Sequence, residues 1–230
     1  MPSPAPLTHL GIILDGNRTW ARARGLPTLE GHRRGYDRLK EFGDWCVARG
    51  IPVVTAFAFS TENWNRAPDE VAYLMELLEL ALSREVGEFD KRGVRLKVIG
   101  RREGLPEAVI RAADAAEERT KNNTKITLQL AINYGGRPEI VDAAKRAIAS
   151  GVRPDDLTEE RFASFLYAPE TPDPDLIIRT AGHKRISGFL LWGAAYSEFH
   201  FTPTLWPDFS EKDLDAALED YAQRTRKFGK

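Results

Sequence analysis

The chain has 230 residues and a formal net charge of −1, from 33 basic and 34 acidic side chains. This length suits one α/β domain with a substantial core, and no internal repeat or Pro/Gly/Ser-rich linker divides it. A net charge near zero provides no global field for binding nucleic acid, so that partner class is not expected. The single cysteine, Cys46, excludes an intrachain disulfide and is compatible with a reducing, cytoplasmic location.

Neither end of the chain indicates a membrane segment. No apolar run approaches the roughly 18 to 20 residues of a transmembrane helix. Asp15 interrupts the N-terminal run that could otherwise be a signal peptide. Residues 1–8, which include three prolines, are predicted to form a flexible tail, and residues 9–230 to form a single domain.

Apolar runs of strand length alternate with longer segments of helical periodicity. This alternation predicts a mainly parallel sheet of about six strands flanked by helices. Gly50 and Gly93 suit helix C-termini, and Ser210 with Asp213 resembles a capping box. In chain order the predicted elements are strand 9–14, helix 31–48, strand 53–59, helix 69–92, strand 95–99, helix 106–122, strand 126–132, helix 138–150, strands 176–179 and 198–201, and a last helix from residue 210.

The predicted helix 69–92 carries one apolar stripe at steps of three and four residues. Such a stripe needs only a core to pack against, although it can also form the wall of an apolar cavity. The sequence alone does not tell which residues of the stripe pack in the core and which line a cavity. The residues of the stripe are Val71, Leu74, Met75, Leu78, Leu82, Val86 and Phe89.

Three predicted strands end in clusters of functional side chains. Residues 60–66 follow the second strand, residues 15–20 the first, and residues 179–187 a late one. Carboxyl ends of parallel strands are where open α/β sheets bind ligands. Each cluster offers hydrogen-bond donors suited to phosphate oxygens, and acids such as Asp15 and Glu62 lie among them. The clusters therefore predict a polyanion site with a divalent cation, the alternative being polar loops with surface ion pairs of little energetic value.

Asp15 is the first candidate for holding that cation. Mg²⁺ needs only one or two protein carboxylates when substrate phosphates supply other ligands. The alternative role for an Asp at this position is to cap the next helix.

Through these residues the chain resembles the cis-prenyltransferases, the undecaprenyl diphosphate synthase family. The similarity runs from about His9 to Phe209, nearly the whole chain. Several long motifs in the right order are far more specific than one short pattern. The motifs are HLGIILDGNRTWA at 9–21, FSTENWNR at 59–66, NYGGR at 133–137, DLIIRTAGHKRISGFLLW at 175–192 and YSEFHFTPTLWPDF at 196–209.

The resemblance implies Mg²⁺ as the cofactor, with Asp15 as its essential ligand and Glu198 as a second. It places Asn63 at the reacting centre, for positioning first and proton relay second, because a neutral amide is a poor base. For the allylic diphosphate it implies Gly16, Asn17, Arg18, Thr19, Trp20 and His32. For isopentenyl diphosphate it implies Arg66, Arg179, Arg185 and Ser187, with Ile186 among them. Between the two lie Ser60, Thr61, Glu62, Asn63 and Trp64.

The resemblance also implies the architecture around the site. A hydrophobic tunnel for the growing chain is expected along helix 69–92. A homodimer is expected, with its interface near Tyr196, Phe199, Phe201 and Trp206, whose aromatic character suits an interface core. The protein is expected in the cytoplasm, with peripheral contact at the inner face of the membrane through its lipid product.

The expected activity is Mg²⁺-dependent condensation of isopentenyl diphosphate with an allylic diphosphate such as farnesyl diphosphate. The product would be a Z-polyprenyl diphosphate resembling undecaprenyl diphosphate, although its length and the preferred primer are not fixed by the sequence. Thr19 and Thr28 replace arginines usual in the family, and His183 replaces a frequent Glu. Candidates to compensate are Arg18, Arg22, Arg24 and Arg33.

Two other functions remain open. The departures from the family pattern at Thr19, Thr28 and His183 permit an enzyme that joins prenyl units irregularly. A non-catalytic subunit of a two-protein prenyltransferase is the second alternative, but the retention of Asp15, Asn17 and Asn63 argues against it.

Overall fold

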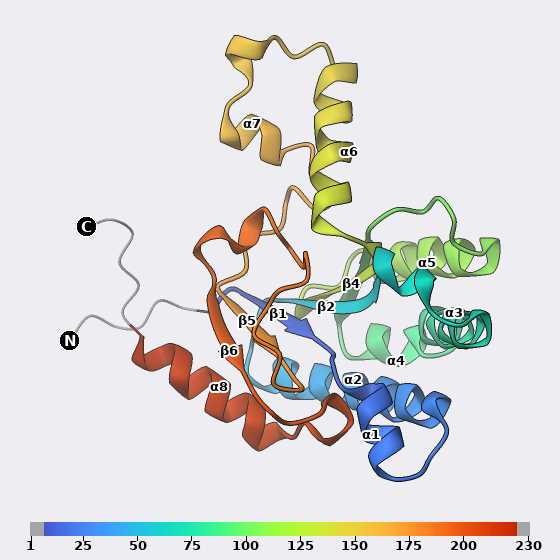
Figure 1. Ribbon diagram of the computed structural model, residues 1–230. Coiled ribbons are helices and arrows are strands. Elements are labelled where there is room, and N and C mark those ends of the chain that lie inside the picture. Colours follow the sequence, from blue (N-terminus) through green and yellow to red (C-terminus); the bar gives the residue numbers. More distant parts are fainter. Residues whose placement is uncertain (1–6, 225–230) are drawn as a thin grey trace.

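One parallel sheet runs through this computed structural model, which describes residues 7–224 (Figure 1). The strand order β3-β4-β2-β1-β5-β6 places β1 between β2 and β5. All five strand pairings are parallel, so the carboxyl ends of the strands share one edge of the sheet. The predicted six-stranded α/β fold is confirmed. The strands are β1 (His9–Ile13), β2 (Val53–Ser60), β3 (Val94–Ile99), β4 (Ile126–Tyr134), β5 (Leu176–Arg179) and β6 (Glu198–Phe201).

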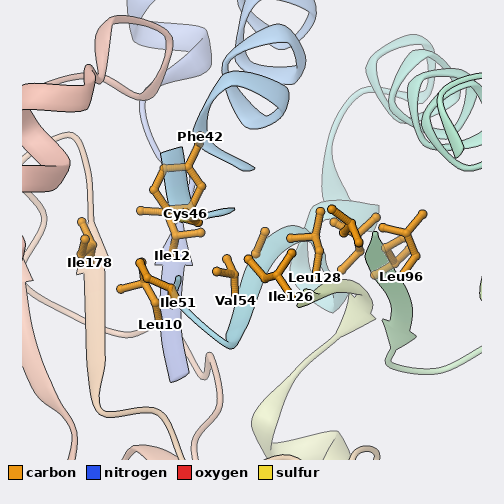
Figure 2. Packing of buried hydrophobic residues seen from close by; sticks show 14 of the residues in the cluster. Leu10, Ile12, Phe42, Cys46, Ile51, Val54, Leu96, Ile126, Leu128 and Ile178 are labelled. Carbon is orange, nitrogen blue, oxygen red and sulfur yellow. The ribbon is translucent and has the colours of Figure 1, made fainter. Parts of the chain in front are cut away.

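Most of the helices cover one face of this sheet. The larger core cluster joins one face of the strands to α2, α3, α4, α5 and α8, and Figure 2 shows Phe42 and Cys46 of α2 beside Ile12 of β1. A smaller cluster around Tyr134 and Phe189 covers the other face. Helices α6 and α7 project from the body as an arm (Figure 1). The helices are α1 (Asn17–Ala23), α2 (Thr28–Ala48), α3 (Pro68–Ser83), α4 (Val86–Lys91), α5 (Glu107–Thr120), α6 (Gly136–Ala149), α7 (Glu159–Ala163) and α8 (Glu211–Gln223).

The prediction of one helix over 69–92 was wrong. Helix α3 ends at Ser83 and α4 begins at Val86. The Ser83 hydroxyl donates a hydrogen bond of 2.7 Å to the Glu79 carbonyl, a contact that competes with the helical backbone pattern. Gly87 lowers helix propensity just beyond the break. The apolar stripe continues across the break, since Leu82 and Val86 are both buried, and this continuity hides the break in the sequence.

Several chain-end and capping predictions can be compared with the structure. Residues 1–6 of the predicted tail lie outside the described residues. The rest of the tail is anchored, because Leu7 packs on the core and Thr8 donates two hydrogen bonds to Asp175, of 2.7 and 2.6 Å. The predicted capping box of Ser210 and Asp213 is present at the start of α8. Gly50 and Gly93, which follow the last residues of α2 and α4, adopt positive φ angles of 63° and 73°.

A β-bulge interrupts β2 at Ala58. Phe57 pairs with Ala131 and Phe59 with Ile132, so Ala58 is the extra residue. Strict alternation would place Phe59 on the same face as Phe57. Because of the bulge, Phe59 instead joins Ala56 in the larger core cluster. Among the helices of residues 7–224, none combines the length and apolar character needed to cross a bilayer.

Candidate active site

A cavity of about 980 Å³ opens at the carboxyl edge of the sheet. Its polar lining comes mainly from the loops after β1, β2 and β5, with further residues from α1, α2 and the start of α6. Its apolar lining comes mainly from α2 and α3 and from β2. The polar residues are Asp15, Asn17, Arg18, Thr19, Arg22, His32, Ser60, Glu62, Asn63, Arg66, Arg137, Arg179 and Ser187. The apolar residues include Leu39, Phe57, Ala58, Leu74, Leu77, Leu78, Ala81 and Leu130.

Asp15 and Arg179 form an ion pair at the polar end of this cavity. The Nη2 atom of Arg179 donates to Oδ2 of Asp15 over 2.8 Å. The arginine side chain is only 5% exposed, whereas that of Asp15 is 33% exposed. Oδ1 of Asp15 accepts no hydrogen bond from residues 7–224, so one carboxylate oxygen faces the cavity without a protein partner.

Contacts with Thr180 and Trp206 help to fix the backbone at Asp15. The Asp15 amide donates to the Thr180 hydroxyl over 2.9 Å, and that hydroxyl donates to the Asp15 carbonyl over 2.6 Å. The Trp206 amide also donates to this carbonyl, over 3.0 Å. Gly16 follows with φ 111°, a conformation unfavourable for other residues, and a Cβ there would lie 2.9 Å from the Leu205 side chain. The turn therefore aims Asp15 into the cavity and starts α1 directly afterwards.

Arg179 also organises the loop that follows β5. Its Nη1 atom donates to the Ser187 hydroxyl over 2.9 Å and to the Arg185 carbonyl. Its Nε–H is buried and has no hydrogen-bond partner among the described residues. The guanidinium thus ties Ser187 to Asp15 and keeps one donor unused at the cavity wall.

Glu70 of α3 is the centre of a second polar cluster, which the sequence analysis missed. Its Oε1 atom accepts hydrogen bonds of 2.9 Å from both His32 and Arg66, and it lies 3.8 Å from Nε of Arg18. Burial alone would raise the pKa of Glu70, but the hydrogen bond from His32 and the charges of Arg66 and Arg18 outweigh it and lower the pKa. Burial lowers the pKa of His32, which favours the neutral ring. Since a carboxylate can only accept, Nε2 of His32 carries the proton and Nδ1 is left as an acceptor.

Asn17 is held in place by close contact with α2. A Cβ at Gly31 would lie 2.1 Å from the Asn17 carbonyl, and one at Gly35 would lie 2.3 Å from its Oδ1 atom. Two glycines one turn apart therefore allow α1 to approach α2 at this point. Oδ1 of Asn17 is buried and accepts no hydrogen bond within residues 7–224.

The Asn63 side chain is oriented by a capping box at the short 3₁₀ helix Thr61–Asn65. Its Oδ1 atom accepts from the Ser60 amide over 3.0 Å. A backbone amide can only donate, so the atom that it contacts must be the Asn63 oxygen. The side-chain NH₂ group is the part left for a ligand, which makes Asn63 a donor and agrees with positioning as its first predicted role.

Six predicted site residues do not line the cavity. Trp20 donates to Asp208 over 2.7 Å, and Trp64 donates to Asn133 over 2.8 Å on the far side of the 3₁₀ helix. The Arg185 side chain is exposed beside His183. Neighbouring residues of a loop cannot all face one cavity, and this limits such runs as site predictions. The six residues are Trp20, Thr61, Trp64, Arg185, Ile186 and Glu198.

Glu198 lies far from Asp15 within one chain. It is level with Leu176 of β5 and hence with Leu10 of β1, five residues before Asp15. At about 3.3 Å per residue, this separates the backbones of the two residues by roughly 16 Å along the strand direction. Oε2 of Glu198 accepts from Arg224 over 2.7 Å. A single chain therefore does not bring both predicted metal ligands together, and residues 7–224 contain no cluster of three or more acidic, His or Cys side chains for a metal.

The structure distinguishes the arginines that were candidates to compensate for Thr19 and Thr28. Arg18 and Arg22 line the cavity. Arg24 pairs with Asp208 and stacks on Trp20, and Arg33 pairs with Asp37, so these two are engaged elsewhere. Arg137, in the first turn of α6, adds a guanidinium that the sequence analysis did not select, although it lies in the quoted NYGGR motif.

Comparison with known proteins identifies the family of this chain. Residues 13–229 match the family described as "Putative undecaprenyl diphosphate synthase". An isoprenyl transferase of Thermotoga maritima is 48% identical over 223 residues, which cover 96% of each chain. Among solved structures, lavandulyl diphosphate synthase from Lavandula x intermedia, in complex with dimethylallyl diphosphate, has a TM-score of 0.94 at 39% identity and covers 97% of this chain and 98% of its own.

A structure of "a probable undecaprenyl diphosphate synthase" from Campylobacter jejuni has a TM-score of 0.83 at 34% identity, covering 98% of this chain and all of its own. The family match, the curated relative and both folds extend over nearly the whole chain. The chain therefore belongs to the undecaprenyl diphosphate synthase family of prenyltransferases.

Proposed function

We propose that the protein is a Mg²⁺-dependent cis-prenyltransferase that condenses isopentenyl diphosphate with an allylic diphosphate such as farnesyl diphosphate. The observation that carries the proposal is the amphipathic cavity. Arginines and Asp15 surround one end, and leucines and alanines of α2, α3 and β2 line the rest. Such a cavity suits a diphosphate head on a hydrocarbon tail, because each half of the ligand meets groups of matching character.

The residues around Asp15 fit a Mg²⁺ ion whose ligands come partly from the protein and partly from the substrate. Asp15 has one carboxylate oxygen without a protein partner, and substrate phosphates can supply further ligands. Asp15 would hold Mg²⁺ against the diphosphate, where the ion would supply positive charge to the departing oxygens. Within residues 7–224 no group of side chains fits a cage built from protein ligands alone.

The reaction follows from the charges around the cavity. The bond between C1 of the allylic substrate and its diphosphate oxygen breaks, and the oxygen keeps the electron pair. Arg18, Arg22 and Arg66 are placed to stabilise the charge that develops on the diphosphate. The isopentenyl double bond then attacks the allylic cation, and a proton leaves the carbon next to the new bond. A diphosphate oxygen is the better acceptor for that proton, since the Asn63 oxygen already accepts a hydrogen bond from Ser60.

The division of the two diphosphate sites follows the contacts. Arg18 and His32 meet at Glu70 together with Arg66, and this contact supports assigning Arg66 to the allylic site in this proposal, whereas the resemblance implied the isopentenyl site. Arg179 and Ser187 bind each other beside Asp15 and form the isopentenyl site in this proposal.

We further propose a homodimer. Val141 and Ile148 on the outer face of α6 are 50% and 79% exposed, and Ala144 lies between them in one stripe. A single chain leaves this apolar stripe on the projecting arm in water. Trp206 does not belong to the interface predicted from the sequence, because it is fully buried and donates to the Gly35 carbonyl. Static light scattering at micromolar concentration tests the dimer, and a fully active monomer would rule it out.

A second activity, irregular coupling of prenyl units, is favoured by one observation. The fold matches lavandulyl diphosphate synthase with a TM-score of 0.94, against 0.83 for the Campylobacter jejuni structure. A non-catalytic subunit is disfavoured, because Asp15, Asn17 and Asn63 line one cavity.

In the proposed setting the enzyme works in the cytoplasm and contacts the inner face of the membrane through its lipid product.

The test is an incubation of the purified chain with radiolabelled isopentenyl diphosphate and farnesyl diphosphate, with Mg²⁺ or with EDTA. Chromatography of the products should resolve a ladder of prenyl diphosphates that EDTA abolishes. Turnover that persists in EDTA would contradict the metal requirement, and absence of turnover by the chain alone would favour the non-catalytic alternative.

A further inference from the structure

The apolar part of the cavity lies between α2 and α3, and two polar contacts connect these helices at its two ends. At one end His32 binds Glu70 over 2.9 Å. At the other, Nζ of Lys40 lies 3.7 Å from Oε1 of Glu85, just after α3. Eight residues separate His32 from Lys40, about 12 Å along a helix. From Glu70 to Ala81, the last residue of α3 on the cavity wall, the distance along the helix is about 16 Å.

Tyr36 lies at the second of these ends, beside Lys40. It is on the cavity wall one turn beyond His32, and its hydroxyl is buried. Burial, followed by the charge of Glu85, raises the pKa of Tyr36, so the phenol stays neutral. Nζ of Lys40 contacts both the Tyr36 ring and Glu85, which is four residues beyond Ala81, so the ring lies near the end of α3.

The ring is also held in this position. Nζ of Lys40 lies 4.8 Å from the centre of the Tyr36 ring and 3.1 Å from Asp37, besides its contact with Glu85. A cation over the face of an aromatic ring contributes roughly 0.5 to 1 kcal/mol at partly exposed sites. Tyr36 is therefore a bulky, braced side chain at the point where a hydrocarbon tail would leave the space between α2 and α3.

We propose that Tyr36 limits the length of the prenyl tail that the cavity accepts, with Lys40 and Glu85 as its support. The proposal rests on the proposed function, because it treats the apolar half of the cavity as the tail site. Ring volume is the cause, so the hydroxyl is not required. A tyrosine that served only to pack α2 against α3 would affect stability without changing the preference for tail length.

The experiment measures binding of prenyl diphosphates with 10, 15, 20 and 25 carbons to the full chain by calorimetry, so that it does not depend on turnover. In the wild type, affinity should stop rising with tail length at some member of the series. In Tyr36→Ala this limit should move up by at least one isoprene unit, with a gain of about tenfold or more for the first tail beyond the wild-type limit.

Three further variants complete the design. Tyr36→Phe should keep the wild-type limit, because it keeps the ring. Tyr73→Ala, which removes a partly buried tyrosine of α3 that is not on the cavity wall, should also keep it. Tyr36→Leu serves if the alanine variant does not fold, and should move the limit in the same direction.

An unchanged limit in both Tyr36→Ala and Tyr36→Leu would overturn the inference. A shift in Tyr36→Phe equal to that in Tyr36→Ala would overturn it too, because the hydroxyl would then be the cause. If the wild type binds the series but forms no product from isopentenyl diphosphate, the proposed function fails, while a shifted binding limit would still support the role of Tyr36.

Discussion

Replacing Asp15 by alanine should reduce both turnover and stability. The change removes the acceptor of the 2.8 Å hydrogen bond from Arg179, whose side chain is only 5% exposed. Leaving one charge of a fully buried pair without its partner costs about 3–5 kcal/mol. Because Asp15 is 33% exposed and water can enter its place, we expect a smaller loss, about 2 kcal/mol. In a chain of this size that loss lowers Tm by roughly 4–8 °C.

The loss of turnover should be far larger than the loss of stability can explain. Removing a main electrostatic stabiliser of the transition state costs about a thousandfold in kcat. Asp15→Asn is the matched control, since its amide oxygen can still accept from Arg179 while the negative charge is absent. It should regain most of the lost Tm but little of the activity. Near-native turnover in Asp15→Ala would refute the metal role, and an unchanged Tm would refute the importance of the ion pair.

Three other changes test separate parts of the site. Ser187→Ala removes the 2.9 Å contact with Arg179 and should raise KM for isopentenyl diphosphate about tenfold more than KM for the allylic substrate. Initial-rate assays measure both KM values, and equal changes in the two would contradict the division of sites. Ala58→Leu narrows the cavity and should shorten the products at nearly unchanged Tm, whereas Ala72→Leu, which faces a groove on the other side of α3, should leave product length unchanged. If Ala58→Leu lowers Tm and keeps product length, Ala58 is core. Glu70 has a lowered pKa, so its contribution to the free energy of unfolding is present above about pH 4.5 and is lost as pH falls towards the folded-state pKa. Urea unfolding at pH 7 and at pH 4 should therefore show a smaller acid-induced loss of unfolding free energy in Glu70→Gln than in the wild type. An equal loss in both proteins would argue against this role.

The sheet could be predicted from the sequence because its strands are short apolar runs that end in polar clusters. Helix α1 could not, since its seven residues carry no apolar period and its start depends on the turn at Gly16. The break between α3 and α4 was hidden by the continuous stripe through Leu82 and Val86. The face of Phe59 was unpredictable for a different reason, because a bulge reverses alternation without leaving a clear signal in composition.

The candidate site was predicted as a region better than as a set of residues. Asp15, Asn63 and Arg179 line the cavity because each follows or ends a strand at the same edge of the sheet. Glu70 was missed because it lies on a helix, although its spacing of four residues from Arg66 is a detectable sign of an ion pair. The environment of Glu198 depends on strand register, which a single sequence does not provide.

The most direct test of the central claim is the covalent structure of the product that the wild-type chain makes from isopentenyl diphosphate and farnesyl diphosphate. Mass spectrometry gives the number of added units, and NMR gives the geometry of each new double bond. A linear prenyl diphosphate whose added units all carry Z double bonds is the predicted result. A branched product would assign the cavity to irregular coupling, and E double bonds in the added units would contradict the account.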